Sequence, residues 1–275
     1  MRFIIAFLIL TLGLHADFSK AEELISKLEE EYGIEIVYKK KEKLTWRLKY
    51  KIADENDAEK FAEYVEVLDE EIRKYPKSFV KLTKLKKIFL VKNLYLSSQY
   101  RAAVPDYAKE ILVLDFAVKD DGDYRKHVIH HEYYHMIEQE FNRSAYYKDK
   151  EWAKLNSSKF KYGKGGKFNR GEDMFPLTNP EKGFINKYSM TALEEDKAEI
   201  FAILFVKEEY EKVSKFRDSI IRQKIEYMKK FLESKDKSFD TSFWQDLHED
   251  EDDLNDDTIE SGRRKKDRDD SRRRK

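Results

Sequence analysis

A short histidine motif constrains this chain more than any other feature. His131-Glu132-Tyr133-Tyr134-His135 places two histidines four residues apart. On a helix they lie one turn above each other, with about 6 Å between their Cβ atoms, so both imidazoles can reach one zinc ion at about 2.1 Å. Glu132 then lies beside the water that such an ion activates, where its carboxylate can accept a proton. The motif predicts the active site of a zinc metallopeptidase.

The surrounding sequence supports a helix here. Asp121-Gly122-Asp123 is expected to form a turn and cap, and residues 138–140 are expected to keep one face in water. His127 extends the histidine row, but about 12 Å of helix separates it from His135. These two cannot share one ion, so a third ligand must come from elsewhere. Apolar residues recur at helical spacing at Val128, Ile129, Met136 and Ile137.

The composition restricts the class of protein. The 275 residues include 55 basic and 55 acidic ones, so the formal net charge is zero. Nothing in that balance favours binding to nucleic acid or to an anionic membrane surface. Aromatic residues make up 14%, which favours a folded body over disorder. The chain contains no cysteine, so neither disulfides nor lipid attachment through cysteine can apply.

The N-terminus predicts export. Met1-Arg2 is a basic start, and an uncharged run from Phe3 to Leu14 follows. Leu14-His15-Ala16 resembles a signal-peptidase site, which predicts a signal peptide over residues 1–16 and a mature chain without a stable membrane span. The alternative is an uncleaved anchor, because Leu14 is not the small residue that the cleavage site prefers. We expect a periplasmic or extracellular protein.

The first half of the chain predicts helices that alternate with strands. Ser97–Asp106, between two buried strands, is expected to form an edge over which substrate lies. The helices are predicted at Asp17–Tyr32 and Asn56–Lys74. The strands are predicted at Ile34–Tyr38 with Trp46–Ile52 as its partner, and at Ile88–Val91 and Ile111–Leu114.

The second half is predicted to be helical after a long loop. Arg143–Lys187 is rich in glycine and is expected to form a flexible basic loop near the cleft entrance. Thr191 and Glu194 match a capping box for a helix that starts at Leu193. The helices are predicted at Leu193–Tyr210, Lys215–Glu233 and around Phe243, Trp244 and Leu247. One domain over residues 17–247 is expected, with a disordered charged tail over residues 248–275.

The third metal ligand is expected on the helix after the loop. Glu195 and Glu199 lie four residues apart on one helix face. Glu195 can bind zinc, and Glu199 can accept the free N–H of a ligating histidine. The alternative is an ordinary acidic first turn, which the helix dipole also favours. The histidine motif upstream favours the interpretation of Glu195 as a metal ligand.

These motifs carry a family resemblance. His-Glu-x-x-His with a later Glu-x-x-x-Glu resembles the gluzincin metallopeptidases, and among them the catalytic domain of anthrax toxin lethal factor. The chain is also similar to zinc-binding metallopeptidases of bacterial envelopes, which show His-Glu-x-x-His-x-x-x-Gln and Glu-Asp-x-Ala-Glu, here at residues 131–139 and 195–199. The resemblance implies zinc on His131, His135 and Glu195, with Glu132 as general base. It also implies Tyr188, seven residues before Glu195, as oxyanion donor. Tyr134 departs from the glycine of lethal factor, which bears on the shape of the substrate pocket.

The expected fold is a zincin-like α+β domain, with a small mixed sheet over the metal-binding helix and a C-terminal helical part. We expect a zinc-dependent peptidase with one Zn²⁺ per chain and a peptide or protein substrate. One alternative is a non-catalytic envelope protein that binds peptides or uses zinc structurally. Another is a scaffold without metal, in which the motif is accidental. A structural zinc site usually has four protein ligands, whereas only three strong candidates are visible, which favours catalysis.

Overall fold

The computed structural model describes residues 18–119, 122–166 and 171–248. The predicted signal peptide and the tail after His248 lie outside the described residues. The chain divides into two units, of which the first ends at Lys237 and the second begins at Ser238. In the second unit, the predicted short helix is present as α9 (Thr241–His248). Phe239 stacks on Trp244, and Phe243 meets both of these rings edge-on.

The first unit contains a small mixed sheet built around β3 (Lys87–Leu96). Its strand order is β1-β3-β6-β5, in which β1 (Glu35–Val37), β3 and β6 (Ile111–Asp115) are parallel. β5 (Ala103–Asp106) is antiparallel to β6 and forms the edge. The far end of β3 also pairs with β2 (Leu48–Lys51) and β4 (Gln99–Tyr100), both antiparallel.

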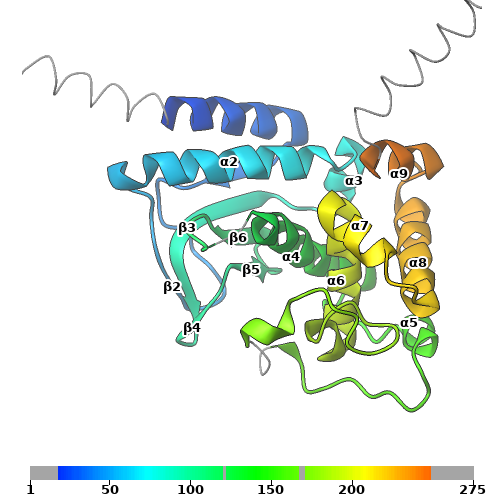
Figure 1. Ribbon diagram of the computed structural model, residues 1–275. Coiled ribbons are helices and arrows are strands. Elements are labelled where there is room, and N and C mark those ends of the chain that lie inside the picture. The colour runs from blue at the N-terminus through cyan, green and yellow to red at the C-terminus, as the bar shows by residue number, and fades with distance from the viewer. Residues whose placement is uncertain (1–17, 120–121, 167–170, 249–275) are drawn as a thin grey trace, which may run out of the picture. The chain divides into compact units, whose positions relative to one another are not determined.

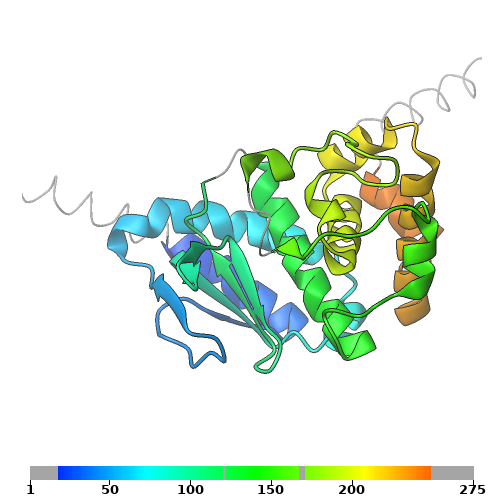
Figure 2. The same cartoon turned by 90° about the horizontal axis from the view of Figure 1, so that it is seen from below.

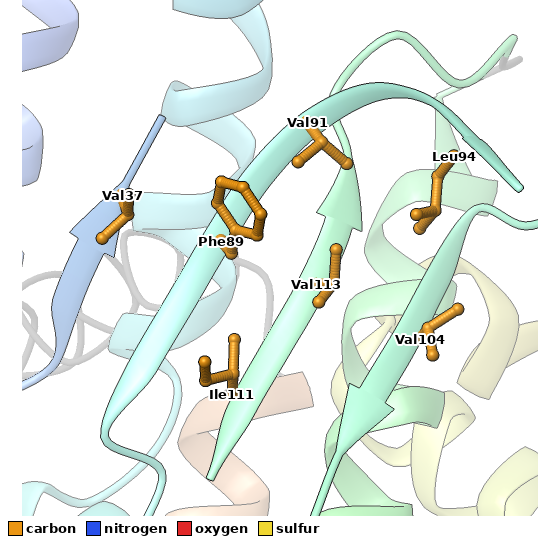
Figure 3. Close-up of a cluster of buried hydrophobic side chains, with 7 residues drawn as sticks. All are labelled: Val37, Phe89, Val91, Leu94, Val104, Ile111 and Val113. Carbon is orange, nitrogen blue, oxygen red and sulfur yellow. The ribbon is translucent and has the colours of Figure 1, made fainter. Parts of the chain in front are cut away.

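One face of this sheet carries a hydrophobic cluster (Figure 3). Alternate residues of β3 and β6 point to the same side of a strand, so they gather there. Leu48 and Tyr50 of β2 pack against the cluster, and the ring of Tyr50 meets that of Phe89 edge-on at 5.2 Å. The buried members are Val37, Phe89, Val91, Leu94, Val104, Ile111 and Val113.

Helices cover the other side of the sheet and make up the rest of the unit (Figures 1 and 2). The helix over residues 18–32 runs beside α2 (Ala58–Arg73), joined to it by the Lys20–Glu66 and Glu31–Arg73 ion pairs. Within this unit, α4 (Asp123–Asn142) lies between the sheet and α6 (Leu193–Phe205) (Figure 2). None of the helices in the described residues is long and apolar enough to span a membrane. The helices are α2 (Ala58–Arg73), α3 (Lys77–Leu82), α4 (Asp123–Asn142), α5 (Lys150–Leu155), α6 (Leu193–Phe205), α7 (Lys207–Ser214) and α8 (Ser219–Lys235), with 3₁₀ turns η1 (Glu55–Asp57), η3 (Glu172–Met174) and η4 (Tyr188–Met190).

The predicted α+β class with a small mixed sheet is confirmed, but one strand pairing is wrong. Trp46–Ile52 was expected to pair with Ile34–Tyr38, whereas β1 and β2 both pair with β3. β3 is ten residues long, so it can hold β1 at its start and β2 at its end. Asn93 has a left-handed φ of 56° and lies within the β2 pairing, where the register shifts between Lys92 and Tyr95.

The helical half shows three further differences. The capping box is wrong: Ala192 is the N-cap of α6, and the Thr191 hydroxyl donates instead to the Tyr188 carbonyl at 2.7 Å. The helix predicted to reach Tyr210 is broken at Val206, where the backbone is extended. The long loop contains α5, whose first turn is capped by the Asp149 carboxylate.

Candidate metal centre

α4 presents the two motif histidines on one face. His131 and His135 are 6% and 8% exposed, and their ring centroids lie 5.0 Å apart. The helix starts after Gly122, whose φ of 101° is one that glycine adopts without strain. Asp121 of the expected cap lies outside the described residues. The four-residue spacing thus brings both Nε2 atoms together, 3.2 Å apart.

α6 packs against α4 and brings Glu195 to the two histidines. Glu195 Oε2 lies 3.1 Å from His131 Nε2 and 3.4 Å from His135 Nε2. Tetrahedral ligands at zinc bond lengths are about 3.4 Å apart, so these three atoms fit one face of a zinc coordination tetrahedron. Two imidazoles and a carboxylate are also a typical catalytic zinc donor set. The residues present therefore fit the metal that the sequence predicts.

The three groups interact strongly with one another. Burial by itself would lower the pKa of His131, but the carboxylates of Glu195 and Glu199 outweigh it and raise the pKa to about 10. Burial would raise the pKa of Glu195, yet its contacts with His131 and His135 hold that pKa well below the ordinary value. A carboxylate and a protonated imidazole thus occupy positions where a cation would replace the proton.

A pocket opens beside this cluster. Glu132 lines it together with His131 and Tyr188. Burial raises the pKa of Glu132, while His131 and His135 pull it the other way. A carboxylate whose pKa is raised toward neutrality is a better proton acceptor and donor near pH 7 than an ordinary glutamate. His127 and Glu199 also line it, and the remaining walls are apolar and aromatic, formed by Ala102, Ala103, Tyr124, Val128 and Phe175.

Tyr188 lies against the cluster from η4. Its side chain is buried, and its ring centroid is 5.8 Å from that of His131. The ring of Phe175 packs against it at 4.9 Å, tilted by 37°. The phenol is therefore held beside the pocket and the candidate metal ligands. The role of Tyr188 as oxyanion donor stays a prediction.

The glycine-rich loop approaches this tyrosine closely. The amides of Gly163 and Gly165 donate to the Met190 and Thr191 carbonyls at 3.1 and 2.9 Å. This pairing brings Gly166 so close to the site that a methyl group there would overlap both the Tyr188 hydroxyl and Glu195 Oε1. Motif spacing did not identify Gly166; the glycine-rich composition of the loop was the only signal for it.

Glu199 sits one turn along α6 from Glu195, behind the histidines. Its Oε1 lies 2.9 Å from His131 Nδ1, the ring nitrogen that faces away from Glu195. Its Oε2 accepts a short hydrogen bond from Asn186, whose own Oδ1 accepts from the Ser189 amide at 2.8 Å. Asn186, which the sequence did not single out, thus connects Glu199 to the turn that carries Tyr188.

His127 belongs to a different cluster from His135, as the helix spacing requires. It lies with His131 and Glu199 in a second group of three possible ligands. Its Nε2 is 3.2 Å from Glu199 Oε1, and its Nδ1 is 2.6 Å from Glu209 Oε2. Both ring nitrogens are therefore engaged by carboxylates. This leaves His131, His135 and Glu195 as the better set for a metal ion.

Buried ion pairs fix α6 behind the site. Lys197 forms a short ion pair with Glu138 of α4 and a second one with Asp149 at 3.3 Å. Asp196 accepts from Lys224 of α8 at 2.7 Å and from Trp152 of α5 at 2.8 Å. Glu138, which was expected in water, is fully buried because Lys197 faces it. These contacts orient the face of α6 that carries Glu195.

Tyr134 faces α6 and not the pocket. It is fully buried, and its ring lies 5.1 Å from that of Phe201. Its hydroxyl donates to Glu138 at 3.4 Å. Tyr134 therefore contributes to the packing of α4 on α6, while the pocket is lined by other residues.

Comparison with known proteins identifies the family of this chain. The family described as "Putative zinc-binding metallo-peptidase" matches residues 21–246. The fold is similar to a solved structure described as a putative zinc-binding metallo-peptidase from Bacteroides caccae ATCC 43185, with 18% sequence identity and a TM-score of 0.51 over 84% of this chain and 91% of that chain. No curated protein matches the sequence. Because the family match covers most of the chain, the protein belongs to the family of putative zinc-binding metallo-peptidases.

Proposed function

We propose that this protein is an exported zinc-dependent peptidase that cleaves internal bonds of peptides or proteins. The convergence of His131 Nε2, His135 Nε2 and Glu195 Oε2 within 3.1–3.4 Å of one another carries this proposal. Glu132 and Tyr188 line the adjacent pocket, where a substrate can meet them. The signal-peptide pattern of residues 1–16 supports export to a periplasm or beyond.

The roles of the side chains follow from their positions. A bound zinc ion supplies Lewis-acid polarisation of a water molecule and of the scissile carbonyl. Glu132 accepts the proton of the attacking water and returns it to the leaving amine, for which its raised pKa is suited. Tyr188 donates a hydrogen bond to the oxygen on which negative charge develops. Glu199 orients the His131 ring from its Nδ1 side.

The edge strand β5 supports a peptide substrate. Along the described part of the chain, no strand pairs with its outer edge. Ala102 and Ala103, at the start of this strand, also line the pocket beside Glu132. An extended peptide can therefore bind by main-chain hydrogen bonds to β5 while one of its side chains enters the pocket.

The alternative of a structural zinc site is less consistent with the geometry. Such a site is usually closed by four protein ligands. Among the residues that the structure describes, each histidine–carboxylate cluster able to hold an ion has three members. Three ligands and a neighbouring pocket leave room for water and substrate.

Metal content and cleavage of a peptide library test the proposal together. The purified mature chain should contain one zinc, which Glu195→Ala and His135→Ala should lose or bind much more weakly. Glu132→Gln should keep its zinc but lower turnover by about 10²–10⁴-fold. Glu140→Gln is the matched control, because Glu140 lies on the same helix but pairs with Lys84. Full zinc in Glu195→Ala, or undiminished cleavage by Glu132→Gln, would contradict the assigned roles.

A further inference from the structure

We propose that His127 is a positioning residue for the metal centre, acting through Glu199 on the ligand His131. This inference rests on the proposed zinc site. It adds to that site a row of three side chains in contact, Glu209–His127–Glu199. The row begins on α7, crosses α4 and ends on α6. None of its members belongs to the three proposed metal ligands.

Both nitrogens of His127 face carboxylates. Glu209 Oε2 lies 2.6 Å from Nδ1, and Glu199 Oε1 lies 3.2 Å from Nε2. An imidazole can donate at both nitrogens only as the imidazolium, so the ring is a positive charge clamped between two negative ones. His127 is 8% exposed, which limits competition from water. Although it lines the pocket, it therefore has no free ring nitrogen to offer a substrate.

The clamp fixes the carboxylate that contacts the metal ligand. Glu199 Oε1 faces both His127 and His131 Nδ1, while Oε2 is held by Asn186. With both oxygens held, the carboxylate has one orientation. The His131 ring is then held with Nδ1 toward Glu199 and Nε2 toward Glu195 and His135. Without His127, Glu199 loses the partner that neutralises its charge on this side.

The break between α6 and α7 makes this row possible. Ten residues of uninterrupted helix would carry Glu209 about 15 Å along the axis from Glu199, too far to contact the same imidazole. The extended backbone at Val206 instead turns α7, and the Val206 carbonyl accepts from the Tyr210 amide at 2.9 Å. Glu209 thereby returns to α4. The helix break therefore has a consequence for the metal centre.

His130 provides a matched control on the same helix. It is fully buried, and like His127 it is bridged to a glutamate of another helix, with Nε2 2.6 Å from Glu71 Oε2. Its other nitrogen lies 2.5 Å from the Tyr75 hydroxyl. Its partners lie on the α2 side of α4, away from the metal ligands. Substitution of either histidine therefore removes a buried histidine–glutamate pair, but only substitution of His127 removes a contact with Glu199.

The test measures metal binding and not turnover. Zinc affinity of the full mature chain is measured by competition with a chromogenic chelator, and the visible spectrum is recorded after substitution with Co²⁺. His127→Gln should weaken zinc binding by about tenfold and change the cobalt spectrum, because second-shell changes of this kind typically cost 10–100-fold. Glu209→Gln should do the same to a smaller extent. His130→Gln should reduce thermal stability while zinc affinity stays within about twofold.

The outcomes separate this inference from the proposed function. If the wild-type chain binds no zinc, both fail. If it binds one zinc, and folded His127→Gln and Glu209→Gln bind it equally well with an unchanged cobalt spectrum, the inference alone is wrong. Equal weakening by His130→Gln would also overturn it, since the effect would then be one of general stability. Should His127→Gln not fold, Glu209→Gln decides, because its side chain is partly exposed.

Discussion

Two buried histidine–glutamate sets on α4 show how the same residue types serve different ends. His130 pairs with Glu71 and Tyr75, so both of its nitrogens have a partner and the set is closed. The Nε2 atom of His131, the next residue, lies close to His135 Nε2 and Glu195 Oε2, at the side of a pocket. Burial lowers the pKa of His130, whereas the two carboxylates around His131 raise its pKa to about 10.

The two sets differ in the direction in which their histidine side chains leave α4. Successive residues of a helix point about 100° apart, so His130 meets α2 while His131 meets α6. A histidine beside a glutamate is therefore no evidence of a metal site by itself. What distinguishes the candidate metal centre is that three possible ligands converge and that a pocket lies beside them. The predictions below compare the two sets directly.

Substitution of His131 and of His130 by alanine should have opposite effects on zinc binding and on stability. His131→Ala should lose zinc, because one of three ligands is gone. His130→Ala should keep one zinc per chain but lower the free energy of unfolding by about 3 kcal/mol, since the buried carboxylate of Glu71 loses a partner. Zinc analysis and urea unfolding of the metal-free proteins measure the two effects. A folded His130→Ala variant without zinc would remove the distinction.

Two buried tyrosines sharpen the comparison. Tyr188→Phe should lower kcat by about 10²–10³-fold with zinc retained, because a donor to the developing oxyanion is lost. Tyr133→Phe removes a hydroxyl that lies 2.6 Å from Thr83 Oγ1, away from the pocket. It should cost about 1 kcal/mol of stability and leave kcat unchanged. Steady-state kinetics measure kcat of both variants, and thermal unfolding measures their stability. Equal kcat values for Tyr188→Phe and wild type would exclude the oxyanion role.

Zinc affinity should depend on pH through His131. In the metal-free protein this histidine keeps a proton up to about pH 10, so zinc must displace the proton to bind at neutral pH. Binding should therefore tighten as the pH rises from 6 to 8, by about tenfold per pH unit for each proton displaced. Calorimetry in buffers of different ionisation enthalpy counts the released protons. An affinity independent of pH would show that His131 is not the protonated group.

The smallest expected effect is at Gly166. Gly166→Ala should lower kcat/KM by about tenfold, because the added methyl group displaces the Tyr188 hydroxyl or the Glu195 carboxylate. A shift in zinc affinity would identify Glu195 as the displaced group. If Tyr188 moves instead, the effect should shrink in a Tyr188→Phe background. Gly171→Ala is the control, because its methyl group would meet Asp173 Oδ1 at 2.7 Å, on an exposed side chain that can move.

Local periodicity in the sequence determined a large part of the fold. The apolar runs of β3 and β6, the helix around residues 123–142 and the helical stripe of α8 are all present. The four-residue spacings of His131–His135 and Glu195–Glu199 also determine which side chains share a helix face. These features depend on residues within one or two turns, so a single sequence contains them.

Only the tertiary structure decided how these faces meet. The burial of Glu138 depends on Lys197, which lies 59 residues further along the chain. The pairing of both β1 and β2 with β3, the break at Val206 and the approach of Gly166 to Tyr188 likewise depend on partners distant in sequence. Periodicity sets the direction of a side chain within its own element. The docking of α6 on α4 depends on buried ion pairs and packing between elements, and that docking brings Glu195 to His131 and His135.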